Sequence, residues 1–311
     1  MPVFRKVKKM EEQKKKKNNK RTLWIIRGLI AVCVIGLAYS GYSLLSSYLE
    51  YKRGDKEYAD LTQFISEPSS SPENPSPDPT PPTPQQQNGD DEPTEPVDSG
   101  EVPDTDEPSN EKEQITYVDN TAPHYWPEID FESLKAINSD FCAWILCPGT
   151  NINYPVARGS DNDFYLDHLF NKKSNKAGAI FMDYRNDTDF SNRNTIIYGH
   201  HMKNRSMFWT LTNYKQQSFY NNNPVVRIVT ENGNYEVHLF AAYVASTSDN
   251  AWRVGFKGEE DFLSWVQEAI DKSDFKSDVA VAYGDKLVTL STCTYEFSDA
   301  RYVVLGKLVA V

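Results

Sequence analysis

The sequence predicts a mainly β fold with added helices, arranged as an antiparallel barrel or sandwich. The first observation is that many short apolar, β-branched runs occur with few of the strand–helix alternations that a doubly wound sheet needs. The second lies in residues 224–245, where two such runs flank "ENGN". Asn-Gly suits a tight turn, so this segment predicts a hairpin. The folded part runs from about residue 115 to Val311, a length that fits one domain.

The N-terminal part predicts a membrane anchor. Residues 1–27 hold eleven Lys/Arg, and residues 28–49 hold no charged residue. This uncharged run is long enough to span a bilayer. The basic flank places the N-terminus in the cytoplasm and the chain after about residue 50 outside. The alternatives are a buried core helix and a cleaved signal peptide, which would end in small residues. The run ends in Tyr48 and Leu49, so an uncleaved anchor is favoured.

Residues 50–114 predict an extracellular linker that is largely disordered. Residues 66–114 contain twelve of the eighteen prolines, fourteen Asp/Glu, one Lys and no aromatic residue. Such a composition buries too little apolar surface to fold, and it favours an extended spacer with a reach on the order of 100 Å or more. The net charge of −11 comes mostly from this segment. It therefore gives no evidence about what the folded domain binds, and we expect no nucleic-acid partner.

The remaining elements are assigned from apolar periodicity and capping residues. Residues 128–138 predict a helix capped by Asp130, with Phe131, Leu134 and Ile137 on one face. Shorter helical segments are expected at 161–170, capped by Asp161, and at 206–220. Residues 259–273 predict an amphipathic helix that buries Phe262, Leu263, Val266 and Ile270. Strands are expected at 141–147, 176–184, 194–201, 286–294 and 301–311, besides the hairpin.

The four cysteines divide into three packing residues and one candidate nucleophile. Cys33 lies in the apolar span. Cys142 and Cys147 are five residues apart in a strand and so face opposite sides, which disfavours a disulfide between them. Neither has the partner spacing of a zinc site. Cys293 ends an apolar strand and is followed by a turn, so its thiol can face a groove.

A cysteine nucleophile needs a neighbour that lowers its pKa or takes its proton. His124, His168 and His238 lie in solvent-like or strand-surface contexts. The strand that ends in Gly199 continues into His200 and His201, which point to opposite sides, so one of them can meet the thiol. Arg301 opens the strand after Cys293. A seven-residue connection between adjacent strands brings its guanidinium beside the sulfur, where it can hold an oxyanion.

These features together resemble the sortases, the cysteine transpeptidases of Gram-positive cell surfaces. "TLSTC" with Arg301 downstream and a strand ending in Gly-His upstream carries the family resemblance. The segments "INSDFCAWILCPGTNINYPVARGSDNDFYLDHLF", "KAGAIFMDYRN" and "NTIIYGHHMKNRSMF" resemble class B. Class C would be expected to show an N-terminal lid and a second membrane span at the C-terminus, and neither is visible in the sequence.

The resemblance implies an eight-stranded sortase barrel with N-terminal helices and a helix inserted before the Cys strand. Cys293 is the expected nucleophile, His200 the catalytic histidine and Arg301 the catalytic arginine. The substrate-binding residues implied are Ser291, Asn162 and Leu166, with Thr247 and Trp252 in a variable segment. Asn162 and Leu166 are expected on one helical face. No metal or cofactor is expected, because "DYRNDTD" (183–189) lacks the pattern of a calcium loop and reads as a solvated turn.

The activity implied is a two-step acyl transfer outside the membrane. Cys293 cleaves a sorting motif after threonine in a secreted protein, and an amine of peptidoglycan or its lipid-linked precursor resolves the thioester. Three alternatives remain: a cysteine peptidase that hydrolyses, a pilin-joining sortase, and a wall-tethered binding module without catalysis. The sorting motif and the acceptor amine cannot be read from the sequence.

Overall fold

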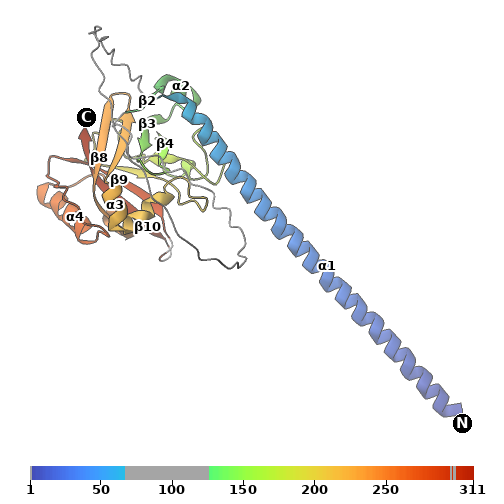
Figure 1. Ribbon diagram of the computed structural model, residues 1–311. Coiled ribbons are helices and arrows are strands. Elements are labelled where there is room, and N and C mark those ends of the chain that lie inside the picture. Colours follow the sequence, from blue (N-terminus) through green and yellow to red (C-terminus); the bar gives the residue numbers. More distant parts are fainter. Residues whose placement is uncertain (1, 67–125, 295, 297–298) are drawn as a thin grey trace, which may run out of the picture.

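A closed eight-stranded barrel forms the centre of the computed structural model, which describes residues 2–66, 126–294, 296 and 299–311 (Figure 1). The strands follow one another around the barrel in the order β10-β8-β7-β3-β4-β5-β6-β9. The expected mainly β barrel with added helices is therefore confirmed. The strands are β3 Phe141–Leu146, β4 Asn153–Ala157, β5 Ile180–Met182, β6 Asn194–Tyr198, β7 Val225–Thr230, β8 Gly233–Ser246, β9 Lys286–Cys293 and β10 Ala300–Ala310.

The barrel interior is filled by the apolar side chains that alternate along these strands. Ile145, Ile228, Leu290 and Val304 are all completely buried in one core cluster. The predicted hairpin joins β7 to β8, and its turn consists of Glu231 and Asn232, with Thr230 paired to residue 233. The turn therefore lies one position earlier than the Asn-Gly pair suggested.

One long helix, α1 (Pro2–Leu61), leads from the N-terminus to the barrel (Figure 1). Its stretch from residue 27 onward contains a window of mean hydropathy 1.8 with no buried residues, long and apolar enough to cross a membrane. Helix α1 is followed by the 3₁₀ helix η1 (Thr62–Phe64) and by β1 (Ile65–Ser66), which pairs antiparallel with β2 (Glu128–Ile129).

The expectation that a disordered linker begins at residue 50 is wrong for residues 50–66. These residues are helical or extended, and they pack on the barrel through Tyr58 and Leu61, which are buried. Composition missed this because the apolar face of the segment is short and its partner is a distant loop. The Pro-rich part of the predicted linker, residues 67–114, lies outside the described residues.

The two predicted amphipathic helices are present, and each buries most of its predicted apolar face. In each helix one residue predicted on that face is exposed instead. In α2 (Phe131–Ile137), Asp130 caps the N-terminus by accepting from the Ser133 N–H at 2.9 Å, and Leu134 is buried. Ile137 is 37% exposed. It lies in the last turn of this short helix.

Helix α4 (Glu259–Asp271) lies between the hairpin and β9 in sequence, as expected for the inserted helix. Phe262 and Val266 are buried, together with Trp265 and Ala269, whereas Ile270 is 39% exposed. The buried stripe of α4 thus runs one position earlier than predicted at its C-terminal end. Its core lies against the outer faces of β8 and β10.

The remaining helices are short. The segment 161–170 contains a single 3₁₀ turn, η2 (Phe164–Leu166), and residues 206–220 contain η3 (Trp209–Lys215) and the start of α3 (Gln217–Asn222). A further 3₁₀ turn, η4 (Asn250–Trp252), precedes α4.

Candidate active site

Cys293 is the last residue of β9, and the strand register brings Arg301 beside it. Strands β9 and β10 are antiparallel, with Cys293 directly opposite Arg301. Directly opposed residues of an antiparallel pair project from the same face. The juxtaposition expected from the seven-residue connection is therefore present.

The other neighbour of β9 delivers the histidine. Strand β6 runs parallel to β9, and Tyr198 lies opposite Ser291. The Gly199 N–H continues the ladder by donating to the Ser291 carbonyl at 3.1 Å. His200 lies two residues beyond Tyr198, and Cys293 lies two beyond Ser291, so the parallel register brings imidazole and sulfur to the same level.

Gly199 is required at this position because a side chain has no space. A Cβ atom there would lie 2.4 Å from Cδ1 of Ile180 and 2.7 Å from the Phe208 ring. Both contacts are shorter than van der Waals packing allows. The glycine thus lets the end of β6 pass against the core and positions the next residue, His200, at the pocket.

His200 and Cys293 line the same pocket and have opposed pKa shifts. The hydrogen bond to His200 lowers the pKa of Cys293 despite burial, and the charges of Arg301 and His200 act in the same direction. The same bond raises the pKa of His200 despite burial, assisted by the Leu166 carbonyl. Nε2 of His200 lies 2.6 Å from that carbonyl oxygen, which only accepts, so Nε2 donates to it. The arrangement favours a thiolate–imidazolium pair.

The other cysteines and histidines do not share this environment. Burial raises the pKa of Cys142 to about 12, which keeps its thiol protonated. His201 turns away from the pocket toward Trp209 and Thr212. The centroids of the His201 and Trp209 rings lie 6.1 Å apart. His168 stacks on Phe164. His124 lies outside the described residues, and His238 is half-buried on β8 beside Glu236.

A pocket of about 250 Å³ opens over Cys293. Among the residues that line it are six that the sequence singled out: Cys293, His200, Arg301, Ser291, Asn162 and Leu166. Phe181 and Tyr198 line it as well and were not predicted. Asn162 and Leu166 do not share a helical face, because Asn162 precedes the single turn η2. Both nevertheless line the pocket, Asn162 from the loop before η2 and Leu166 from the end of η2.

The two residues assigned to the variable segment differ in their placement. The Trp252 indole N–H donates to Ser291 Oγ at 3.0 Å, so Trp252 contacts a residue of the pocket without lining the pocket itself. Thr247 is exposed and does not line the pocket. It sits in a turn that is closed by the Ser246 N–H donating to Asp249, and this turn directs it to solvent.

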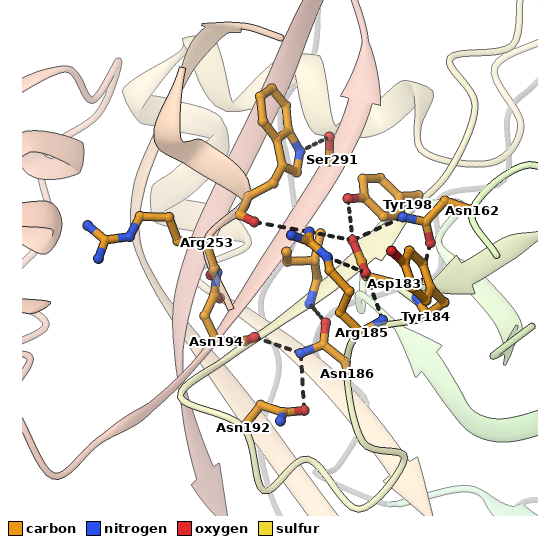
Figure 2. Close-up of polar contacts among 12 residues, drawn as sticks. Asn162, Asp183, Tyr184, Arg185, Asn186, Asn192, Asn194, Tyr198, Arg253 and Ser291 are labelled. Atoms are coloured by element: carbon orange, nitrogen blue, oxygen red, sulfur yellow. Dashed lines mark hydrogen bonds and ion pairs between the residues drawn. The ribbon is translucent and has the colours of Figure 1, made fainter. Parts of the chain in front are cut away.

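The segment 183–189 begins with a buried carboxylate, so the expected solvated turn is wrong at its start. Asp183 is completely buried directly after β5. It accepts hydrogen bonds from Arg185 Nε at 2.8 Å, from Arg185 Nη2 at 2.7 Å and from the Tyr198 hydroxyl at 2.8 Å (Figure 2). Asn162 Nδ2 donates to the same carboxylate at 3.1 Å. Sequence reasoning missed this cluster because only Arg185 is close to Asp183 in the sequence. Asn162 and Tyr198 come from other segments.

Among the described residues, no group of three or more His, Cys, Asp or Glu side chains is arranged to hold a metal ion. A thiolate beside an imidazolium and a fixed guanidinium is suited to acyl transfer through a thioester.

Comparisons with known proteins give the same result. A sortase domain model matches residues 145–309. Sortase B of Staphylococcus aureus is 40% identical over 183 residues, covering 58% of this chain and 75% of that protein. Sortase B of Listeria monocytogenes is 37% identical over 182 residues, covering 58% and 74%. A solved Staphylococcus aureus sortase B–substrate complex superposes with a TM-score of 0.56 at 40% identity, covering 58% of this chain and 85% of that one. The chain therefore belongs to the sortase family of cysteine transpeptidases, in class B.

Proposed function

We propose that this sortase cleaves a sorting motif after threonine, holds the acyl group on Cys293 and transfers it to a cell-wall amine. The observation that carries the proposal is the convergence of Cys293, His200 and Arg301 in one pocket, with opposed pKa shifts on the first two. The remaining lining residues make the pocket largely apolar beside these charges, which suits a short peptide.

In the first step, the Cys293 thiolate attacks the threonine carbonyl carbon and the carbonyl electrons move onto oxygen. The guanidinium of Arg301 stabilises this oxyanion. The carbon–nitrogen bond then breaks, and the His200 imidazolium gives its proton to the leaving amine. A thioester on Cys293 and a neutral imidazole remain.

In the second step, the acceptor amine attacks the thioester carbon. Neutral His200 removes a proton from the attacking nitrogen, the carbon–sulfur bond breaks, and Cys293 leaves as thiolate. The new amide joins the substrate to the acceptor, and the thiolate–imidazolium pair is restored. We assign the acceptor to peptidoglycan or its lipid-linked precursor.

The chain acts at the outer face of the membrane in this proposal. The apolar part of α1 forms a single span, the basic residues 1–27 keep the N-terminus cytoplasmic, and the barrel lies outside. Protease added to intact cells is expected to degrade the barrel and to spare an N-terminal tag. Degradation of the tag alone would reverse the topology.

The acyl-transfer proposal is tested with the full-length protein in detergent, a mixed library of sorting pentapeptides and an amine. Mass spectrometry is expected to find a thioester on Cys293 and, with amine present, a transpeptidated product. The variant Cys293→Ala forms neither. Turnover at full rate without an amine would indicate hydrolysis, and preference for a pilin lysine over cell-wall peptide would indicate a pilin-joining enzyme. Full biological output from Cys293→Ala would contradict catalysis altogether.

A further inference from the structure

One ion pair beneath the pocket connects walls that come from three separate segments. Asp183 accepts from Asn162, in the loop before η2, and from Tyr198, at the end of β6. Its partner Arg185 donates through Nη2 to the backbone carbonyl of Trp252 in η4 at 3.1 Å (Figure 2). Trp252 in turn donates to Ser291 Oγ on β9.

The connection is rigid because each member has more than one partner. Arg185 contacts the carboxylate in a bidentate manner, and its own backbone N–H adds a third hydrogen bond at 2.9 Å. Asn162 is held at both ends of its amide, since its Oδ1 accepts from the Tyr184 N–H at 3.0 Å. Burial opposes ionisation of Asp183, yet the hydrogen bonds from Arg185 and Tyr198 lower its pKa. The carboxylate is therefore charged at neutral pH and acts purely as an acceptor.

We propose that Asp183 and Arg185 are a positioning pair that holds the Asn162 loop and the Trp252 turn against strands β6 and β9 and thereby sets the affinity for the sorting peptide. Asn162, Tyr198 and Ser291 all line the pocket, and Trp252 donates a hydrogen bond to Ser291. The inference rests on the proposed function, because it assigns the pocket to the sorting motif. Neither Asp183 nor Arg185 lines the pocket, so the pair acts through the residues it holds.

The test compares Arg185→Gln with a matched control, Arg253→Gln. Arg253 also pairs with a carboxylate, donating from Nη1 to Asp261 Oδ1 at 3.0 Å, and it follows Trp252 directly. Its side chain makes no contact with Asp183 or with the pocket residues. Both changes remove one paired arginine from the same region, and they differ in the link to the pocket walls.

We expect Arg185→Gln to raise KM for the sorting peptide about tenfold, the effect of losing one charge-assisted hydrogen bond. The kcat, and the rate at which iodoacetamide alkylates Cys293, stay close to the wild-type values, as do all parameters of Arg253→Gln. Arg185→Lys keeps a charge beside Asp183 but cannot hold both the carboxylate and the Trp252 carbonyl in a fixed fork. It is therefore expected to restore the melting temperature while KM remains raised.

Equal KM values for the two Gln variants would overturn the inference. A fall in the rate at which iodoacetamide alkylates Cys293 in Arg185→Gln, as large as the rise in KM, would overturn it as well. If Arg185→Gln does not fold, Arg185→Lys with wild-type KM overturns it in the same way. These outcomes are distinct from failure of the proposed function, in which the wild-type protein itself forms no thioester with any peptide.

A second, independent observation concerns how the barrel is joined to the membrane helix. The Tyr58 hydroxyl donates to the Gly178 carbonyl at 2.8 Å, and its ring packs edge-on against Tyr154. Glu50 accepts from the Lys176 N–H at 3.1 Å, and its backbone carbonyl accepts from Asn175 at 2.9 Å. The last three turns of α1 therefore lie directly on the loop before β5.

The described residues on either side of the Pro-rich segment are also paired. Ser66 pairs with Glu128 at the end of a two-stranded sheet. We infer that α1 itself carries the barrel, through its contacts with the loop before β5. From Leu49 to Tyr58 the helix rises about 13 Å. This places the barrel close to the membrane surface, in contrast to the spacer expected from composition.

A cysteine cross-link tests the docking in the full-length, membrane-embedded protein with Cys293→Ala. A Cβ added at Gly54 would lie 3.4 Å from Cβ of Ala177, near the separation that a disulfide needs. We expect Gly54→Cys with Ala177→Cys to cross-link, and Lys56→Cys with Ala177→Cys, whose first residue is exposed, to remain reduced. After cleavage at a protease site inserted in residues 67–125, the barrel is expected to stay in the membrane pellet even without the cross-link. Equal cross-linking of the two pairs, or release of the barrel on cleavage, would overturn the inference.

Discussion

Replacing Gly199 with alanine tests whether close packing behind the histidine positions the catalytic pair. The new methyl group would lie 2.4 Å from Ile180 Cδ1 and 2.7 Å from Cδ2 of Phe208, and 2.8 Å from Cγ of that ring. Both side chains are completely buried. They have no empty space into which to move, so the strand end must move outward and take His200 with it.

The structural cost can be stated from these contacts. Overpacking a well-filled core costs about 1–3 kcal/mol. In a domain of this size each kcal/mol lowers the melting temperature by roughly 2–4 °C, so a decrease of roughly 2–12 °C is expected. A displacement of about 1 Å at a catalytic group costs on the order of 10²-fold in rate. Thioester formation should therefore fall far more than stability alone explains, since most molecules remain folded at 25 °C.

The assay combines a thermal melt with the rate of thioester formation on Cys293. Gly255→Ala is the matched control, because a Cβ at Gly255 would meet no atom within 4 Å and its φ lies outside the left-handed region. It is expected to leave the rate unchanged and to alter stability by less than about 1 kcal/mol. If Gly199→Ala behaves like Gly255→Ala in both measurements, the proposed steric positioning of His200 is refuted.

Three further predictions follow from the charges around the pocket. His200→Gln removes the hydrogen bond that lowers the pKa of Cys293, so the pH profile of iodoacetamide alkylation should shift to higher pH; an unchanged profile would contradict the pairing. Arg301→Lys keeps the charge but loses the planar fork, and kcat should fall about 10²–10³-fold while alkylation of the thiol changes little; an unaffected kcat would exclude the oxyanion role. The pKa of Asp183 is lowered from its ordinary 3.8, so its contribution to stability is complete above that pH and is lost as pH falls through the lowered value. Arg185→Gln removes a cause of this lowering and should move the midpoint of acid unfolding, followed by tryptophan fluorescence, to higher pH; an identical midpoint would contradict it.

The parts of the site that the sequence predicted are those set by short chain distances or by strand direction. A seven-residue connection between antiparallel strands determines that Arg301 faces Cys293. A glycine at the end of a strand followed by two histidines limited the second partner to His200 or His201, and the resemblance to the sortases selected His200. In both cases local geometry limits the number of positions that a side chain can reach.

The parts that were missed depend on contacts between distant segments. Asp183 is buried because Asn162 and Tyr198 reach it from other elements, and no local pattern distinguishes it from a turn aspartate. Tyr58 lies in a charged, linker-like stretch and is buried because the loop before β5 and the Tyr154 ring of β4 cover it. Composition and periodicity describe a segment on its own, and they do not report which surface meets it after folding.

The position of Cys293 between its two neighbours explains why barrel closure and chemistry are inseparable in this protein. Strand β9 pairs on one side with β6, in parallel, and on the other with β10, antiparallel. A parallel pair presents corresponding ends at one edge of the sheet, and an antiparallel pair returns the chain to that edge. Cys293 therefore lies between the end of β6, which is followed by His200, and the beginning of β10, which carries Arg301. The imidazole and the guanidinium reach the thiol from opposite sides only when β9 closes the barrel, so the perturbed thiol pKa is itself a product of the closed fold.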